Sequence, residues 1–244
     1  RDVAAARRPR VKPTESFLAA AADAGIAFES GELDQLGQYL ALLVEANETT
    51  NLTRIVDPDD AWPRHILDAL QLLALLGELP PEAKVLDVGS GGGIPAIPLA
   101  IVRPDLQFTL LEATGKKVEF LSSTAQALGL GNVNVVQDRA ENAAAFRGDH
   151  RGVYHAVTAR AVAPLATLVE LTIPFLVEGG LLLAIKGQKA AEEIEAAEKA
   201  LRELRGVVVG TSRHDTGTIV VVEKRGPTPR IYPRRDGEPK RRPL

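Results

Sequence analysis

A run of glycines that follows an apolar segment is the most chemically informative feature of this 244-residue sequence. Gly89, Gly91 and Gly93 come directly after residues 85–88, and Asp87 stands two residues before the first glycine. Because glycine has no Cβ, such a loop can turn tightly after a strand and approach a ligand closely. A strand, a glycine loop and a helix in this order are typical of sites for nucleotide-like cofactors.

Acidic positions further along the chain fit the same kind of ligand. Glu112 lies 19 residues after Gly93, at the end of the next expected strand, and a carboxylate there can accept hydrogen bonds from two ribose hydroxyls. The sequence Asp-Arg-Ala-Glu at 138–141 follows the third expected strand. The alternative interpretations are a solvated strand-end charge for Glu112 and a helix N-cap for Asp138.

The spacing of the glycines discriminates between cofactors. A dinucleotide-binding loop, G-x-G-x-x-G, would need glycine at position 94, where this chain has Ile94. A P-loop is excluded because the sequence contains no G-x-x-x-x-G-K-[ST]. The observed D-x-G-x-G-x-G suits S-adenosylmethionine, whose ammonium needs a nearby carboxylate such as Asp87 and which has no pyrophosphate to seat at a helix N-terminus. The sequence therefore predicts S-adenosylmethionine as the cofactor.

These groups must be positioned by an α/β domain that follows a helical region. Residues 15–77 carry apolar residues at helical spacing, interrupted by turn-forming residues at 47–63. Beyond residue 84, expected strands alternate with expected helices. The expected strands are 85–88, 108–111, 133–136, 153–158, 181–185, 207–210 and 218–223, and the expected helices are 97–102, 115–128, 164–177 and 189–204.

This alternation predicts an α/β protein with the Rossmann-like fold of class I S-adenosylmethionine-dependent methyltransferases. We expect a seven-stranded, mostly parallel sheet that ends in an antiparallel hairpin, preceded by an N-terminal helical extension. The expected divisions are a basic, flexible N-terminus at 1–13, the helical extension at 14–80, the methyltransferase domain at 81–224 and a basic tail at 225–244.

Charge is distributed unevenly along the chain. The net charge is -3, yet residues 1–13 carry +4 and residues 225–244 carry +5, which leaves -12 on the rest. Two basic ends on an acidic body suit a protein that contacts a polyanion such as nucleic acid, although soluble, ragged termini would have the same composition. No apolar run is present in the first 13 residues, and the apolar stretch at 161–185 is broken by Glu170 and Glu178. We expect a cytoplasmic protein with no membrane span.

The absence of cysteine narrows the chemistry. The chain has no Cys and four His, so thiol nucleophiles and iron–sulfur clusters are excluded and a metal site is not expected. After the fourth expected strand, where amino-group methyltransferases have Asn/Asp-Pro-Pro-aromatic, the sequence is Ala159-Arg160-Ala161. A site without a general base suits an acceptor that is already nucleophilic, such as a purine ring nitrogen, and leaves positioning as the source of catalysis.

Several co-linear motifs together resemble the RsmG family, also called glucose-inhibited division protein B. They are Asn51-Leu52-Thr53, Asp57-Pro58, Arg64-His65-Ile66-Leu67-Asp68, the glycine loop, Ile101-Val102-Arg103-Pro104, Lys116-Lys117-Val118-Glu119-Phe120-Leu121, Ala159-Arg160-Ala161 and Lys186-Gly187. The resemblance extends from about residue 35 to 190 and continues at Pro227-Thr228-Pro229 and Tyr232-Pro233-Arg234-Arg235. Members of this family are bacterial methyltransferases that act on guanine N7 of small-subunit ribosomal RNA.

The resemblance implies roles for individual residues. It implies direct transfer of a methyl group from S-adenosylmethionine to guanine N7 of 16S ribosomal RNA, free or in the 30S particle, by a monomer without metal. Arg160 would orient the reacting groups. It implies cofactor contacts from Gly89, Ile94, Glu112, Ala113, Thr114, Ala140, Glu141 and Arg160, to which the glycine-loop pattern itself adds Asp87, Gly91 and Gly93. Substrate contacts would come from Asn51, Thr53, Arg64, His65, Asp68 and Lys186.

One departure from the family pattern concerns the last strand. The family often has Arg-His before this strand, whereas this chain has Gly217-Thr218, with Arg213 and His214 a few residues earlier.

Two other functions remain compatible with the residues alone. They are methyl transfer to a small molecule, which would not need basic ends, and a non-catalytic RNA-associated module that only binds the cofactor.

Overall fold

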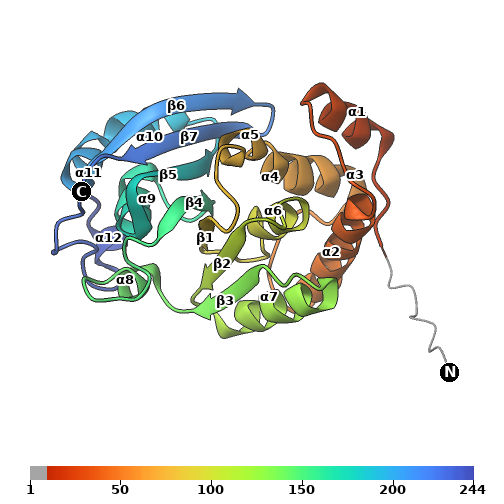
Figure 1. Ribbon diagram of the computed structural model, residues 1–244, viewed down its shortest axis with the longest axis horizontal. Helices are drawn as coiled ribbons and strands as arrows, with labels where there is room; N and C mark the ends of the chain where they lie inside the picture. Colours follow the sequence, from red (N-terminus) through yellow and green to blue (C-terminus); the bar gives the residue numbers. More distant parts are fainter. Residues whose placement is uncertain (1–9) are drawn as a thin grey trace.

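The computed structural model describes residues 10–244 and contains a seven-stranded sheet with helices on both faces (Figure 1). The strand order is β3-β2-β1-β4-β5-β7-β6. Strands β1 to β5 are parallel, and β7 is antiparallel to its neighbours β5 and β6. The strands are β1 (Lys84–Val88), β2 (Gln107–Glu112), β3 (Val133–Gln137), β4 (Tyr154–Arg160), β5 (Leu176–Lys186), β6 (Gly206–His214) and β7 (Gly217–Lys224). The predicted Rossmann-like fold with a terminal antiparallel hairpin is confirmed.

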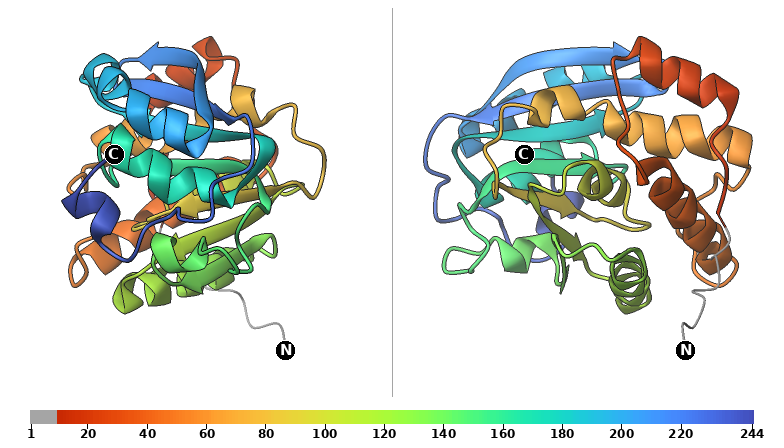
Figure 2. Two further views of the ribbon diagram at one scale, coloured as in Figure 1. Left: turned by 90° about the vertical axis from the view of Figure 1, so that its left-hand side faces the viewer. Right: turned by 45° about the vertical axis from the view of Figure 1, so that its right-hand side comes forward.

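Two hydrophobic cores lie on opposite faces of the sheet, because successive strand residues point to opposite sides. Val85 belongs to one core and Leu86 to the other. The first core is covered by α6 (Ala96–Val102), α7 (Gly115–Leu128) and the N-terminal helices. The second is covered by helices that follow β3, as the views in Figure 2 show. These are α8 (Ala140–Ala143), α9 (Leu165–Thr172), α10 (Ala190–Ala196) and α11 (Glu198–Leu204).

The N-terminal extension is helical, as the periodicity predicts, and packs against α6 and α7. Its helices are α1 (Glu15–Asp23), α2 (Glu32–Asn47), α3 (Pro58–Ala61), the π-helix η1 (Trp62–Leu67), α4 (Asp68–Leu70) and α5 (Leu73–Leu76). The predicted loop at 47–63 is shorter, because Pro58 begins α3. Proline suits the first turn of a helix, where its missing N–H has no intrahelical acceptor.

Two predicted helix boundaries on the second face differ from the structure. The helix predicted at 164–177 ends at Thr172, followed by the short 3-10 helix η2 (Ile173–Phe175). Pro174 lies in η2 and cannot donate the hydrogen bond that would continue α9. The helix predicted at 189–204 is divided at Ala197 into α10 and α11.

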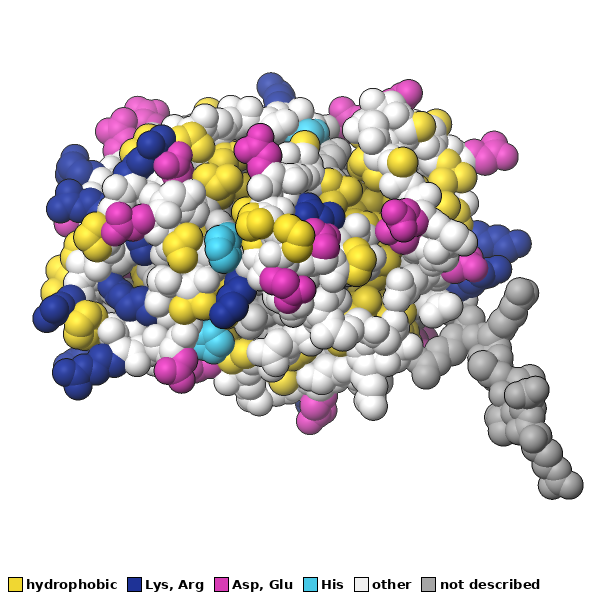
Figure 3. Space-filling model, viewed as in Figure 1, with side chains coloured by type: hydrophobic (Ala, Val, Ile, Leu, Met, Phe, Trp, Pro, Cys, Tyr) yellow, Lys and Arg dark blue, Asp and Glu magenta, His cyan; other side chains and the backbone are white. Residues whose placement is uncertain are grey.

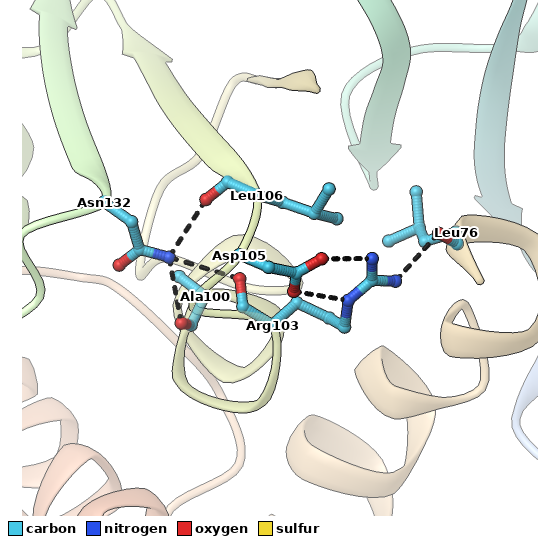
Figure 4. Close-up of polar contacts among 6 residues, drawn as sticks. All are labelled: Leu76, Ala100, Arg103, Asp105, Leu106 and Asn132. Atoms are coloured by element: carbon cyan, nitrogen blue, oxygen red, sulfur yellow. Dashed lines mark hydrogen bonds and ion pairs between the residues drawn. The ribbon is translucent and has the colours of Figure 1, made fainter. Parts of the chain in front are cut away.

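The amino ends of the strands are held by a polar brace (Figure 4). Arg103, after α6, pairs with Asp105 at 2.7 Å and donates to the Leu76 carbonyl at 2.8 Å. Asn132 donates to the carbonyls of Ala100, Arg103 and Leu106 at 3.1 to 3.3 Å. Residues 101–104 thus link α5, α6 and β2 at the amino ends of the strands, whereas the glycine loop lies at their carboxyl ends.

Of the two basic ends of the chain, the structure describes the whole C-terminal one and only part of the N-terminal one. Residues 1–9, the larger part of the predicted flexible N-terminus, lie outside the described residues. Residues 225–244, the C-terminal segment, cross the second face and contain α12 (Glu238–Arg241), which lies beside α8 in Figure 1. Among residues 10–244, no helix combines the length and apolar character required to cross a membrane.

Candidate functional site

Two adjoining cavities open at the carboxyl ends of the parallel strands. The larger cleft, of about 950 Å³, lies between the glycine loop, residues 51–55, η1 and the end of β4. The smaller cavity, of about 200 Å³, lies between the ends of β2 and β3 and the start of α9. Gly89 lines both, and residues 160–163 continue from one into the other. Ligands of open α/β sheets bind at this edge, where strand order reverses.

Asp87 lies under the glycine loop and is 1% exposed. Its Oδ1 accepts a hydrogen bond from Thr158 Oγ1 at 2.7 Å, whereas its Oδ2 is buried without a hydrogen-bond partner. Burial raises the pKa of Asp87 to about 6, and the hydrogen bond from Thr158 opposes this shift. A buried carboxylate with an unsatisfied oxygen fits a ligand that supplies a cation and a hydrogen-bond donor, as the ammonium of S-adenosylmethionine would.

Glu112 connects the end of β2 to the glycine loop. Its Oε2 accepts from Gly91 N at 3.0 Å, and its Oε1 accepts from Thr114 N at 2.9 Å. Each carboxylate oxygen has a second lone pair, so Glu112 can still accept hydrogen bonds from ribose hydroxyls. Because Glu112 is bonded on both sides, its carboxylate is held in place before any ligand arrives.

The glycine loop is shaped by contacts on both sides of the sheet. A Cβ on Gly89, which has φ +70°, would lie 3.0 Å from Val162 Cγ2. A Cβ on Gly93, which has φ +89°, would lie 2.6 Å from Ile97 Cγ1, so this glycine serves helix packing rather than ligand approach. From α2, the buried Tyr39 hydroxyl donates to the Gly92 carbonyl at 2.7 Å.

Arg160, at the end of β4, joins the sheet to η1. Its guanidinium donates to the Arg64 carbonyl at 2.9 Å and lies 3.5 Å from Asp68 Oδ2. The same guanidinium approaches His65 Nδ1 at 3.4 Å. Asp68 also accepts a hydrogen bond from the Thr216 hydroxyl in the turn between β6 and β7. Arg160 therefore works as a fixed cation at the wall of the larger cleft.

His65 is the buried centre of this wall. Its Nε2 lies 2.9 Å from Thr53 Oγ1 and 3.3 Å from the Ile55 carbonyl, which ties residues 51–55 to η1. Burial, together with the charge of Arg160, lowers the pKa of His65 to about 4. His65 is thus neutral at physiological pH and holds the loop. The π-helical turn that carries it is a feature frequently found at functional sites.

The structure brings most of the predicted site residues to these cavities. The larger cleft is lined by Asn51, Thr53, Arg64, His65, Gly89, Gly91, Ile94 and Arg160. The smaller cavity is lined by Gly89, Glu112, Ala113, Ala140 and Glu141. The remaining predicted residues line neither cavity, and they are Asp68, Asp87, Gly93, Thr114 and Lys186.

Lys186 is turned into the protein. Its Nζ donates to the Ala163 carbonyl at 2.8 Å and pairs with Glu193 Oε2 at 2.6 Å. Glu193 in turn accepts from Leu165 N at 2.8 Å, at the start of α9. In this arrangement Lys186 supports residues 163–165, which adjoin the smaller cavity, and its charge is already paired.

Four residues of the site were not among the residues predicted from the sequence. Tyr39, Thr158 and Thr216 act through Gly92, Asp87 and Asp68. Lys117, part of the Lys-Lys pair in α7, lines the larger cleft. Of these four, only Lys117 lies in a sequence motif that could have identified it. Arg213 and His214 line neither cavity, and His214 faces a separate groove beside α5.

No group of three or more His, Cys, Asp or Glu that could hold a metal ion occurs within residues 10–244. The polar groups of the two cavities instead suit an elongated organic ligand. Asp87 stands near the junction for a cationic end, and Glu112 stands at the smaller cavity for ribose hydroxyls. The residues present therefore fit S-adenosylmethionine.

Comparison with known proteins also points to a methyltransferase. The family model GidB, described as rRNA small subunit methyltransferase G, matches residues 32–217. A Sorangium cellulosum protein named ribosomal RNA small subunit methyltransferase G is 47% identical over 223 residues, covering 91% of this chain and 92% of that protein. Its namesake in Deinococcus deserti is 44% identical over 237 residues, covering 95% and 96%.

Solved structures support the fold. A Methanococcus maripaludis protein assigned as an S-adenosyl-L-methionine-dependent methyltransferase has a TM-score of 0.57 at 16% identity, covering 83% of this chain and 98% of that chain. At such identity the likeness concerns the fold alone. The match of the family model and the extensive identity to its members establish that this chain belongs to the rRNA small subunit methyltransferase G family.

Proposed function

We propose that this protein transfers a methyl group from S-adenosylmethionine to N7 of a guanine in small-subunit ribosomal RNA. Membership of the family carries the reaction and the substrate class. The observation in this chain that carries the cofactor is the pair of carboxylates at the glycine loop. Asp87 is buried beneath the loop with an unsatisfied oxygen, and Glu112 lines the smaller cavity at the end of β2.

Among the described residues, no Asp or Glu lines the larger cleft, so no carboxylate is available there to take a proton from the acceptor. His65 has a lowered pKa and is engaged with Thr53. The hydroxyl of Tyr39 donates to Gly92, and burial raises its pKa. Guanine N7 carries a lone pair and no proton, so transfer there needs no base.

The residues of the site would act by holding and orienting. When bound, S-adenosylmethionine supplies an electrophilic methyl group on sulfur. Asp87 would hold its ammonium, Glu112 its ribose, and Arg160 would keep the cleft wall fixed so that guanine N7 meets the methyl group in line with the departing sulfur. The new N7–methyl bond forms as the sulfur–methyl bond breaks, which yields S-adenosylhomocysteine.

Exposed cations near the site would bind RNA phosphates. Arg64, on η1, is exposed and lines the larger cleft. In the C-terminal segment, Arg235, Lys240, Arg241 and Arg242 are exposed, and Figure 3 shows Lys and Arg gathered over this end of the molecule. Such contacts add affinity without sequence information. The protein would act as a monomer in the cytoplasm, where its ribosomal substrate is found.

The test is incubation with methyl-labelled S-adenosylmethionine and either 30S subunits or free 16S RNA from a strain that lacks the activity. We expect label at N7 of one guanine, identified by mass spectrometry of nuclease digests, and none with Asp87→Asn. Label on a small molecule from a cell extract, but not on RNA, would overturn the substrate class. Cofactor binding without transfer to either RNA would overturn the enzymatic function.

A further inference from the structure

The C-terminal segment, a basic tail in the sequence, is anchored to the domain by buried charge. The guanidinium and backbone N of Arg234 donate to Glu170 of α9 at 2.6 to 3.1 Å, and Glu170 is 0% exposed. Arg151 donates to the carbonyls of Thr228, Pro229 and Tyr232 at 2.7 to 3.2 Å. Paired buried charges fix this segment, because an unpaired charge at either position would be costly.

Beyond this anchor the segment reaches the smaller cavity. Gly237 N donates to Glu141 Oε1 at 2.9 Å, and Asp236 pairs with Arg139 at 2.5 Å. Thr167, in the wall of the cavity, donates to the Pro239 carbonyl at 3.3 Å. Lys240 itself lines the cavity, opposite the residues that follow β2 and β3.

Glu141 is a residue of the smaller cavity that the C-terminal segment holds by a hydrogen bond. It is 8% exposed and lines the cavity. Its Oε1 is held by Gly237, 96 positions away in the sequence. Gly237 has φ +72°, a conformation that glycine adopts without strain, so the chain can turn here and aim its N–H at the carboxylate. The position of Glu141 therefore depends on the C-terminal segment.

We propose that residues 234–240 form part of the cofactor site, closing its adenosine end and fixing Glu141. This inference rests on the proposed function, which makes the smaller cavity the place of adenosine. We therefore expect the affinity for adenosine-containing ligands to depend on contacts between residues that do not themselves line the cavities. The Arg234–Glu170 pair is such a contact, because neither residue lines the two cavities.

The test loosens the anchor in the full-length chain. The double variant Arg234→Gln/Glu170→Gln removes both charges and leaves no unpaired ion. Arg225→Ala is the matched control, since Arg225 is an exposed cation of the same segment that lies outside residues 234–240 and lines neither cavity. Binding of S-adenosylhomocysteine and of 5′-methylthioadenosine, which lacks the amino-acid end, is measured by calorimetry. Hydrogen exchange of residues 234–240 reports whether the segment is loosened, and the melting temperature reports whether the domain is folded.

We expect the double variant to bind both ligands at least tenfold more weakly, with faster dissociation and a folded domain. Arg225→Ala should bind both ligands as the wild type does. Asp87→Asn should lose affinity for S-adenosylhomocysteine only, because it acts at the amino-acid end. Equal loss of both ligands in the double variant thus locates the effect at adenosine.

Affinity within twofold of the control, with exchange showing a loosened segment, overturns the inference and leaves the proposed function intact. If the exchange is unchanged, Gly237→Pro replaces the double variant under the same criteria, because proline lacks the N–H that donates to Glu141 and cannot adopt the φ of +72° found here. Wild-type protein that binds neither ligand would instead overturn the proposed function, so the two failures are distinguishable.

Discussion

Asp87 is the residue whose ionisation should control cofactor binding. Its pKa is raised by burial to about 6, so the carboxylate is protonated in the free protein below that pH. A ligand ammonium needs the ionised form, and affinity therefore falls as the pH falls. We expect the dissociation constant of S-adenosylhomocysteine to rise by up to about tenfold per pH unit between pH 6 and 5.

Calorimetric titration between pH 5 and 7 measures this dependence. His65 has a pKa of about 4 and stays neutral over the range, so it does not contribute. Asp87→Asn is the control and should show weak binding that is independent of pH. A wild-type affinity that stays constant from pH 7 to 5 would contradict the role of Asp87.

Arg160 is expected to affect transfer more than cofactor affinity. Arg160→Ala removes the hydrogen bond to the Arg64 carbonyl and the contact with Asp68, which frees η1 from the end of β4. We expect methyl transfer to slow by about 100-fold, the order expected for a misplacement of about 1 Å. Single-turnover transfer and S-adenosylhomocysteine binding are measured side by side.

Arg160→Lys serves as the comparison, since lysine keeps the charge but not the planar fork of donors. Its transfer rate should lie between those of the wild type and Arg160→Ala. Full transfer by Arg160→Ala, with normal cofactor affinity, would remove Arg160 from the reaction.

At the scale of elements, α2 of the N-terminal helical extension supports the glycine loop. The Tyr39 hydroxyl is buried and donates to the Gly92 carbonyl, and burial raises its pKa so that it remains a donor. We expect Tyr39→Phe to lower the free energy of unfolding by about 1–2 kcal/mol and to weaken S-adenosylhomocysteine binding. Denaturant unfolding and calorimetry measure the two effects.

Tyr154→Phe is a matched control for this prediction. The Tyr154 hydroxyl lies 2.6 Å from His150 Nδ1, and neither residue lines the two cavities. It should lose comparable stability without a change in cofactor affinity. Equal cofactor binding by both variants would show that α2 does not support the loop.

At the scale of the whole molecule, charge is expected to govern the contact with RNA. Replacing Arg235, Arg241 and Arg242 by alanine removes three exposed cations near the site. We expect weaker RNA binding and a log–log salt slope smaller by about 2, since each phosphate contact to single-stranded RNA contributes about 0.7. Filter binding at several salt concentrations measures the slope.

Lys84→Ala is the control, because Lys84 is an exposed cation at the start of β1, on the opposite edge of the sheet. Its salt slope should equal that of the wild type. A triple variant with an unchanged slope would show that the C-terminal segment does not meet RNA.

Local sequence patterns were enough to predict the parallel sheet, the glycine loop and the positions of Asp87 and Glu112 at strand ends. Strand and helix patterns repeat over a few residues, and the carboxyl ends of adjacent parallel strands always meet at one edge. The two cavities open at that end of the sheet, so local patterns were sufficient to place Asp87 and Glu112 beside the glycine loop.

The segments that are distant in sequence and complete the site became visible in the folded protein. Tyr39 meets Gly92 across 53 positions, Thr216 meets Asp68 across 148, and Gly237 meets Glu141 across 96. These contacts depend on how helices and the chain end pack, which local periodicity does not encode. For the same reason Lys186 is paired inside the protein, and the basic tail is a wall of the smaller cavity.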